Sequence, residues 1–368
     1  MESNRKIKVG ITHGDINGVG YEIILKAFSD PTMFDLCTPI VYGSPKAMTY
    51  HRKAMDIQTN YSIISNADDA NDDALYVINT CGEGEPKVNF AHPTEESGSF
   101  AVCALDRAIA DFREGLIDVL VTAPVCASMI KVEGTNFTNQ AAYVAYNLKS
   151  DGDSPLQIYL NDVMRVASVT ENIPLSKVAG AISVENIMQK FEVFHKSLKS
   201  DFLISNPRIA ILSLNPKSGE GAMGKEESEI IAPAIEQLRA KRYQCYGPYA
   251  ADTFFGNGLY DHFDGVLAMY YDQGVTPLKA LSLMGVVNYT AGVEAIHTQP
   301  EHGALLDDAG KGIADESALR NAVYSAIDIL RNRESDAEAS RNPLRKLYRG
   351  GRDDSDKLKL DQPTKEDE

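Results

Sequence analysis

Two glycine-rich turns have the composition of loops that lie against a ligand. The first, Gly14–Glu22, follows a short apolar run and opens a helical pattern, where free backbone N–H groups favour an anion. It lacks the Gly-x-Gly start of the dinucleotide fingerprint, so both a structural turn and a ligand contact stay open. The second, Leu214–Gly224, also follows an apolar run, and its serine and glycines could cradle a phosphate.

Histidine and cysteine spacing predicts no local metal or redox motif. The seven histidines form no HxH or HxxxH pair, and the five cysteines form no CxxC pair. The sequence also contains no nucleophile elbow and no P-loop. Any cluster of these side chains must therefore be assembled by the fold.

Five polar segments between the apolar runs form a recognisable series along the chain. They occupy residues 11–20, 137–141, 170–175, 214–221 and 269–274. In order, from about residue 6 to about residue 345, the chain resembles the 4-hydroxythreonine-4-phosphate dehydrogenase family. That family oxidises a phosphorylated amino alcohol with NAD on the route to pyridoxal phosphate.

The resemblance assigns divalent-metal ligands to three positions, each a histidine in the family. This chain has Asn172, Lys217 and Tyr271 there. The metal is the Lewis acid of the family reaction, worth several kcal/mol of transition-state stabilisation. An amide oxygen is a poor substitute for imidazole and an ammonium repels a cation, so we expect no divalent metal.

The substrate positions implied by the resemblance are partly retained. Lys279 and Asn288 match substrate-binding residues of the family. Thr138 and Gln140 lie in the segment where the family carries a substrate-binding histidine and threonine. His297 replaces an arginine, and an imidazole with the usual pKa of about 6.5 is mostly neutral at pH 7.

If the family geometry holds across the dimer, Asn172, Lys217 and Tyr271 form a candidate metal-free catalytic set, because a nearby ammonium lowers the pKa of a tyrosine. The adjacent Asp272 is a further catalytic candidate. Three interpretations remain open. The chain is an impaired family member that survives as a ligand-binding or protein-binding fold. Alternatively, it is a metal-independent oxidoreductase acting on a related phosphorylated hydroxy compound. In the third interpretation, other residues supply the metal and the family activity persists.

A loop near the C-terminus resembles the nucleotide loop of the family and of isocitrate and isopropylmalate dehydrogenases. The resemblance implies that His302, Gly303, Asp307 and Gly310 contact NAD, although a retained structural loop is the alternative.

The cleft is also expected to attract an anion. Lys279 and Lys217 are cationic, Asn288 is a neutral donor, and residues 219–221 offer backbone N–H groups. A small phosphorylated ligand is therefore the expected partner, with occupancy rising as His297 protonates at lower pH.

Alternating strand and helix patterns must position these residues. Six short apolar runs predict strands buried on both faces of a mainly parallel sheet, at 8–12, 39–42, 119–122, 165–170, 208–214 and 265–270. Helical spacing of apolar residues predicts helices at 100–115, 226–241 and 316–331. This alternation indicates an α/β fold.

The resemblance implies a two-domain α/β/α homodimer similar to isocitrate and isopropylmalate dehydrogenases, with one metal histidine supplied by the partner subunit. The expected domains are residues 1–125 plus 275–345, and residues 126–274. Residues 346–368 form a polar acidic tail.

Composition narrows the class of protein. The 368 residues carry a formal net charge of −16, which argues against a nucleic-acid partner. No apolar run approaches the roughly 20 residues of a membrane span, and the polar start does not resemble a signal peptide. Together with an odd number of cysteines, these features predict a cytoplasmic protein without a membrane partner.

Overall fold

Twelve strands join in one sheet within the part of the chain that the computed structural model describes, namely residues 5–71, 73–82, 86–129, 137, 139–149, 152, 154–220, 224–282 and 285–341. In chain order the strands are β1 (Ile7–Thr12), β2 (Cys37–Gly43), β3 (Ser62–Ile64), β4 (Tyr76–Asn79), β5 (Val119–Thr122), β6 (Leu156–Leu160), β7 (Arg165–Thr170), β8 (Ile209–Leu212), β9 (Cys245–Tyr249), β10 (Gly265–Tyr270), β11 (Val287–Ala291) and β12 (His297–Pro300).

Helices alternate with most of these strands. They are α1 (Gly20–Ala27), α2 (Met33–Leu36), α3 (Pro45–Ala54), α4 (Glu95–Arg113), α5 (Gln140–Leu148), α6 (Val178–Ala181), α7 (Val184–Ser200), α8 (Ala232–Ala240), α9 (Ala251–Gly256), α10 (Tyr271–Ala280) and α11 (Ser317–Arg341). None of the helices in the described part of the chain is both long and apolar enough to cross a bilayer.

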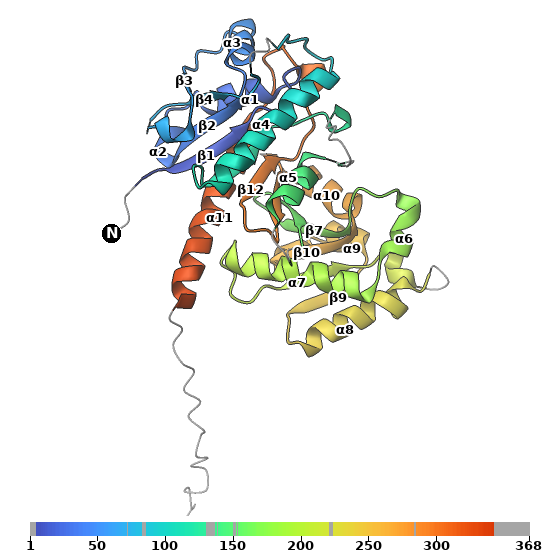
Figure 1. Ribbon diagram of the computed structural model, residues 1–368. Coiled ribbons are helices and arrows are strands. Elements are labelled where there is room, and N and C mark those ends of the chain that lie inside the picture. The colour runs from blue at the N-terminus through green and yellow to red at the C-terminus, as the bar shows by residue number, and fades with distance from the viewer. Residues whose placement is uncertain are drawn as a thin grey trace, which may run out of the picture.

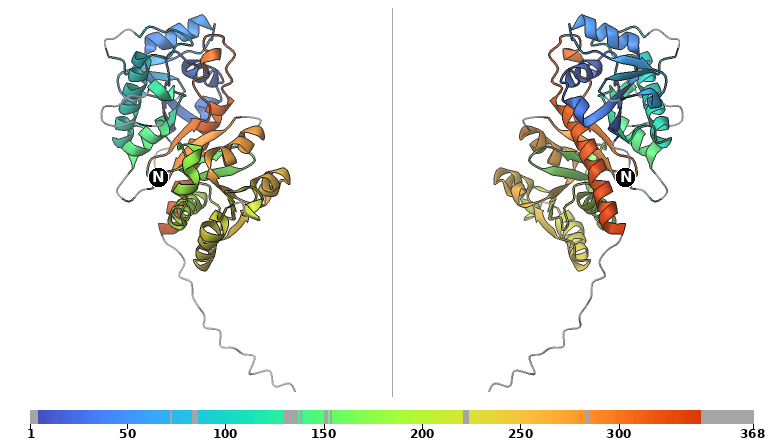
Figure 2. Two further views of the ribbon diagram at one scale, coloured as in Figure 1. Left: turned by 90° about the vertical axis from the view of Figure 1, so that its right-hand side faces the viewer. Right: turned by 90° about the vertical axis from the view of Figure 1, so that its left-hand side faces the viewer.

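The sheet is parallel at both ends and antiparallel in the middle. Its order is β3-β4-β2-β1-β5-β12-β11-β6-β7-β10-β8-β9, and only the pairs around β11 and β6 run antiparallel. Figures 1 and 2 show the N-terminal strands and helices at one end of the molecule and α7 to α9 at the other. The predicted mainly parallel α/β class is therefore confirmed. The proposed domain boundaries near residues 126 and 275 stay a prediction.

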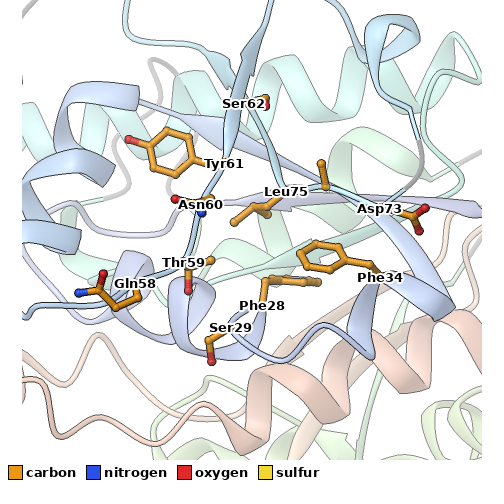
Figure 3. A pocket seen from close by; sticks show the side chains of 11 residues that line it. Phe28, Ser29, Phe34, Gln58, Thr59, Asn60, Tyr61, Ser62, Asp73 and Leu75 are labelled. Carbon is orange, nitrogen blue, oxygen red and sulfur yellow. The ribbon is translucent and has the colours of Figure 1, made fainter.

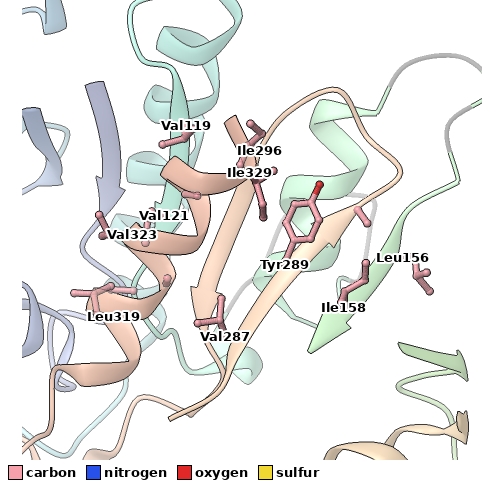
Figure 4. Packing of buried hydrophobic residues seen from close by; sticks show 14 of the residues in the cluster. Val119, Val121, Leu156, Ile158, Val287, Tyr289, Ile296, Leu319, Val323 and Ile329 are labelled. Carbon is pink, nitrogen blue, oxygen red and sulfur yellow. The ribbon is translucent and has the colours of Figure 1, made fainter. Parts of the chain in front are cut away.

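Helix α11 spans the junction between the two ends of the sheet. It packs against β5, β11 and β12, and Figure 4 shows Val121, Val287 and Leu319 among the buried side chains of this part of the core. A buried ion pair ties the helix further: Arg333 Nε donates to Asp201 Oδ1 at 2.8 Å. The hydroxyl of Tyr289 donates to the other oxygen of Asp201 at 2.7 Å. The C-terminal helix is thereby fixed to β11 and to the end of α7.

All six predicted strands are present, while the predicted helices differ at their ends. Helix α4 begins at Glu95, earlier than predicted, because the Thr94 side chain accepts a hydrogen bond from Ser97 N and caps it. The predicted helix at 226–241 begins with a π-helical turn, Glu227–Ile231, before α8. Helix α11 continues ten residues beyond the predicted end at Arg331. The predicted tail at residues 346–368 lies outside the described residues.

Candidate active site

The three positions assigned to metal ligands do not all come together in this chain. Asn172 is exposed in the loop after β7, with a φ of 51°. Tyr271, at the start of α10, lines a cavity of about 110 Å³ together with Asn172 and Asp272. Lys217 is exposed in the 3₁₀ turn Pro216–Gly219 and is absent from the described residues that line this cavity.

Glu301 is the acceptor on which the polar side chains of the cleft converge. The hydroxyl of Tyr271 donates to Glu301 Oε1 at 2.7 Å, and Asn288 Nδ2 donates to Oε2 at 3.1 Å. Lys279 Nζ lies 3.7 Å from Oε1. The Glu301 side chain is only 15% exposed, whereas that of Lys279 is 43% exposed. The structure therefore brings three of the predicted site residues together around a residue that the sequence analysis missed.

Tyr271 does not have the properties expected of a catalytic base. Burial, reinforced by the negative charge and hydrogen bond of Glu301, raises the pKa of Tyr271 well above its usual range. Within this chain Lys217 does not contribute to the pKa of Tyr271, and an effect of Lys217 across a dimer stays a prediction. At neutral pH the Tyr271 hydroxyl keeps its proton and acts as a hydrogen-bond donor.

A second carboxyl group lies near this cluster. Glu171 follows β7, and its Oε1 atom is covered and has no hydrogen-bond partner among the described residues. Burial raises the pKa of Glu171 to about 8; the Lys190 ammonium opposes this rise and the Glu301 charge adds to it. Tyr159 hydrogen-bonds to Glu171, and its ring stacks edge-on against Tyr271 with centroids 5.3 Å apart. At pH 7 the Glu171 carboxyl is thus mainly protonated and can exchange a proton.

Gln140 has no hydrogen bond to Glu301 among the described residues and bonds instead to the end of β5. It is the first residue of α5, capped by Asn139, whose side chain accepts a hydrogen bond from Ala142 N at 2.8 Å. Gln140 Nε2 donates to Ala123 O at 3.1 Å, while its covered Oε1 atom has no partner in the described part of the chain. This contact joins α5 to the end of β5. Thr138, the other predicted residue of this segment, lies outside the described residues.

His297 belongs to the core of the sheet. It is fully buried in β12, with Nε2 at 2.9 Å from the hydroxyl oxygen of Thr122 and Nδ1 at 2.9 Å from that of Thr290. Burial lowers the pKa of His297 to about 3. The expectation that His297 protonates near pH 6.5 and helps to bind phosphate is therefore wrong, because burial removes the solvation that the charged form needs.

The nucleotide-loop residues divide into an open part and a packed part. His302 Nδ1 lies 2.9 Å from Gly303 O, so the neutral ring presents Nε2 as an acceptor. That Nε2 atom is covered and lacks a partner among the described residues, while a Cβ at Gly303 would meet nothing within 4 Å. Gly310 has a φ of 78°, and a Cβ there would lie 2.6 Å from the Phe90 ring. Asp307, which lies between Gly303 and Gly310 along the chain, is exposed.

These features fit NAD at His302 and Gly303. A covered, unpaired acceptor beside open space suits the amino group or ribose hydroxyls of a nucleotide. Gly310 has a packing reason of its own, so its presence does not depend on a ligand.

Helix α1 holds both ends of this loop. Val19 N donates to Ala304 O at 3.1 Å. The buried Glu22 accepts from Ala314 N at 2.8 Å and from Lys26 Nζ at 2.7 Å. Lys26 Nζ also donates to Ala314 O at 2.7 Å. Packing explains the glycine turn before α1 as well, since a Cβ at Gly20 would lie 2.0 Å from His13 O.

The implied divalent metal does not fit the residues present. Tyr271 donates to Glu301, and Lys217 is a cation on an exposed turn. In the ranges that the structure describes, no three His, Cys, Asp or Glu side chains group as metal ligands. Whether the purified protein lacks metal stays a prediction.

A different hollow, of about 380 Å³, lies in the N-terminal part of the sheet and is shown in Figure 3. Phe28, Phe34 and Leu75 contribute to its apolar wall. Its described lining includes no buried polar side-chain atom without a partner. This hollow therefore offers no sign of a specific polar ligand.

Comparison with known proteins agrees with the fold and identifies the family. Residues 35–326 match the family model described as pyridoxal phosphate biosynthetic protein PdxA. A 4-hydroxythreonine-4-phosphate dehydrogenase from Bacteroides thetaiotaomicron is 53% identical over 362 residues, which cover 98% of this chain and 99% of the relative. One from Sulfurihydrogenibium sp. is 35% identical, covering 89% of this chain and all of the relative.

A solved structure gives the same result. The 4-hydroxythreonine-4-phosphate dehydrogenase from Klebsiella pneumoniae superposes with a TM-score of 0.76 at 26% identity, covering 90% of this chain and 99% of that one. Family model, relatives and structure agree over most of the length. The chain therefore belongs to the PdxA family of pyridoxal phosphate biosynthetic proteins, which includes the 4-hydroxythreonine-4-phosphate dehydrogenases.

Proposed function

We propose that this family member keeps the ligand cleft but has lost the metal-dependent step, so that oxidation of 4-phosphooxy-threonine is severely impaired or absent. The hydrogen bond from Tyr271 to Glu301 carries this proposal. A metal ligand must offer a lone pair to the cation, whereas this phenol keeps its proton and directs it at a carboxylate. Lys217 offers a positively charged ammonium group, which has no lone pair to give to a metal ion.

NAD is the cofactor expected for the remaining cleft. When bound, it would supply the hydride acceptor of an alcohol oxidation. The unpaired His302 Nε2 and the open backbone at Gly303 would hold its nucleotide part. Glu22 and Lys26 keep the loop in position through Ala314. Glu171, whose pKa is raised to about 8, is a candidate for proton exchange with a ligand.

The test is a side-by-side assay with the Bacteroides thetaiotaomicron relative. Both proteins are purified identically, their metal content is measured, and turnover of 4-phosphooxy-threonine with NAD is followed with added Zn²⁺, Mg²⁺ or Mn²⁺. We expect no stoichiometric metal in this chain and a kcat/KM lower by about a thousandfold, which corresponds to about 4 kcal/mol of lost Lewis-acid stabilisation. Retained metal with turnover comparable to that of the relative contradicts the proposal.

The metal-independent oxidoreductase based on Lys217 and Tyr271 is not favoured, because the pKa of Tyr271 is raised by burial and by Glu301. A homodimer, a cytoplasmic location and domain boundaries near residues 126 and 275 remain predictions. Light scattering of the purified protein tests the first of these.

A further inference from the structure

The donors around Glu301 form an anion-binding set that is already filled. A phenol hydroxyl, a side-chain amide and an ammonium approach one carboxylate, at 2.7, 3.1 and 3.7 Å. Neutral donors combined with one cation are a common way for proteins to hold a phosphate or carboxylate group. Here the group that they hold belongs to the chain.

We propose that Glu301 acts as a built-in anionic ligand, which takes the place of a phosphate or carboxylate and restricts this subsite to ligand groups that are uncharged or cationic. The inference deepens the proposed function, since it concerns the same cleft. It identifies Glu301 as a residue that determines specificity.

The position of Glu301 is set by the sheet. Its backbone N donates to Val286 O at 2.7 Å, next to the antiparallel pairing of β11 with β12. In that pairing Asn288 lies opposite Gln299, two residues before Glu301. Tyr271 and Lys279 come from the two ends of α10. The paired strands therefore bring the carboxylate within hydrogen-bond distance of two neutral donors, Tyr271 and Asn288.

Two covered side-chain atoms, on Asn288 and His302, have no hydrogen-bond partner within the described ranges, and both are acceptors. Asn288 donates through Nδ2 to Glu301, while its covered Oδ1 has no partner among the described residues. His302 directly follows Glu301, and its covered Nε2 atom also has no hydrogen-bond partner in the part of the chain that the structure describes. Both atoms need a donor such as a hydroxyl or an ammonium group. A phosphate dianion brings only acceptors and would add charge beside Glu301.

Equilibrium binding of inorganic phosphate at pH 8, without metal or NAD, tests the proposal. Glu301→Gln removes the charge and keeps the shape of the side chain, and we expect it to bind phosphate at least tenfold more tightly than the parent. Glu236→Gln is the matched control, since it removes the same charge from an exposed position on α8. This control should leave phosphate affinity unchanged.

A second variant tests whether Lys279 binds the phosphate in Glu301→Gln. Adding Lys279→Ala to Glu301→Gln should remove most of the gained affinity, because the ammonium is the only full positive charge among the three donors that approach Glu301. Glu301→Ser, verified as folded by its thermal transition, should gain affinity in the same direction. Equal phosphate affinity in the parent and both Glu301 variants overturns the proposal, as does an equal gain in Glu236→Gln. Because phosphate binding needs neither metal nor turnover, this outcome is separate from the dehydrogenase assay.

Discussion

Replacing His297 with glutamine is expected to make folding less sensitive to acid. In the folded chain, burial lowers the pKa of His297 to about 3, whereas an unfolded histidine titrates near about 6.5. Between these values the folded state binds fewer protons than the unfolded state. The contribution of His297 to stability is therefore complete above about pH 6.5 and is lost as the pH falls toward 3.

The size of this loss of stability at pH 5 follows from the pKa of histidine in the unfolded state. That pH lies about 1.5 units below the unfolded pKa, and each unit corresponds to about 1.36 kcal/mol. His297 therefore lowers the free energy of unfolding at pH 5 by about 2 kcal/mol. The folded pKa scarcely affects this figure, because pH 5 is well above it. His13 and His51 are also fully buried, with pKa values lowered by burial to about 4, and each should cost a similar amount.

Urea denaturation followed by far-UV circular dichroism at pH 7 and pH 5 measures this effect. The parent should lose about 2 kcal/mol more than His297→Gln between the two pH values. Glu171, His13 and His51 titrate in both proteins and cancel in the comparison. Removing the exposed His262 with His262→Gln should leave the pH dependence of the parent unchanged. If the parent and His297→Gln lose equal stability, His297 is not held neutral in the core and the reasoning fails.

Three further outcomes follow from the geometry. Arg333→Met leaves the buried Asp201 carboxylate, 3% exposed, without its cation and should cost about 3–5 kcal/mol; a thermal midpoint within about 1 °C of the parent would contradict this. His302→Ala should weaken NAD binding about fivefold by calorimetry, through the loss of roughly 1 kcal/mol of hydrogen bonding, and unchanged affinity would place the nucleotide elsewhere. Glu22→Gln should speed hydrogen exchange at the Ala314 amide, whereas unaltered protection would show that the loop is held by other contacts.

The strands buried on both faces were the part of the fold most readily predicted from sequence. Their continuous apolar content, as in Val119–Thr122, is typical of parallel strands that helices cover on both sides. Strand β12 could not be found in this way, because its four buried residues are His297, Thr298, Gln299 and Pro300. Their burial is tolerated since their polar side chains find distant partners. Thr298, for example, donates to Ala322 O at 2.8 Å in α11. Such compensation exists only in the folded chain.

The donors of the candidate site were predicted from the sequence, but the acceptor that they share, Glu301, was not. The family resemblance implied Tyr271, Lys279 and Asn288, which lie close together along the chain. Glu301 carries no motif of its own, and its role depends on the pairing of β11 with β12. The only local signal was an acidic residue directly before His302, at the end of an unpredicted strand. Likewise, nothing in the sequence showed that His297 would be surrounded by two threonine hydroxyls.

The polar groups of the cleft depend on one another. A buried phenol at position 271 needs an acceptor, and a carboxylate at position 301 needs donors, so either one alone would be costly. Together they satisfy each other, which explains how the chain accommodates Tyr271 at a position that the resemblance gives to a metal ligand. Replacing Tyr271 with histidine would therefore remove the shortest hydrogen bond that Glu301 accepts, so such a change alters the environment of Glu301 as well as the ligand position.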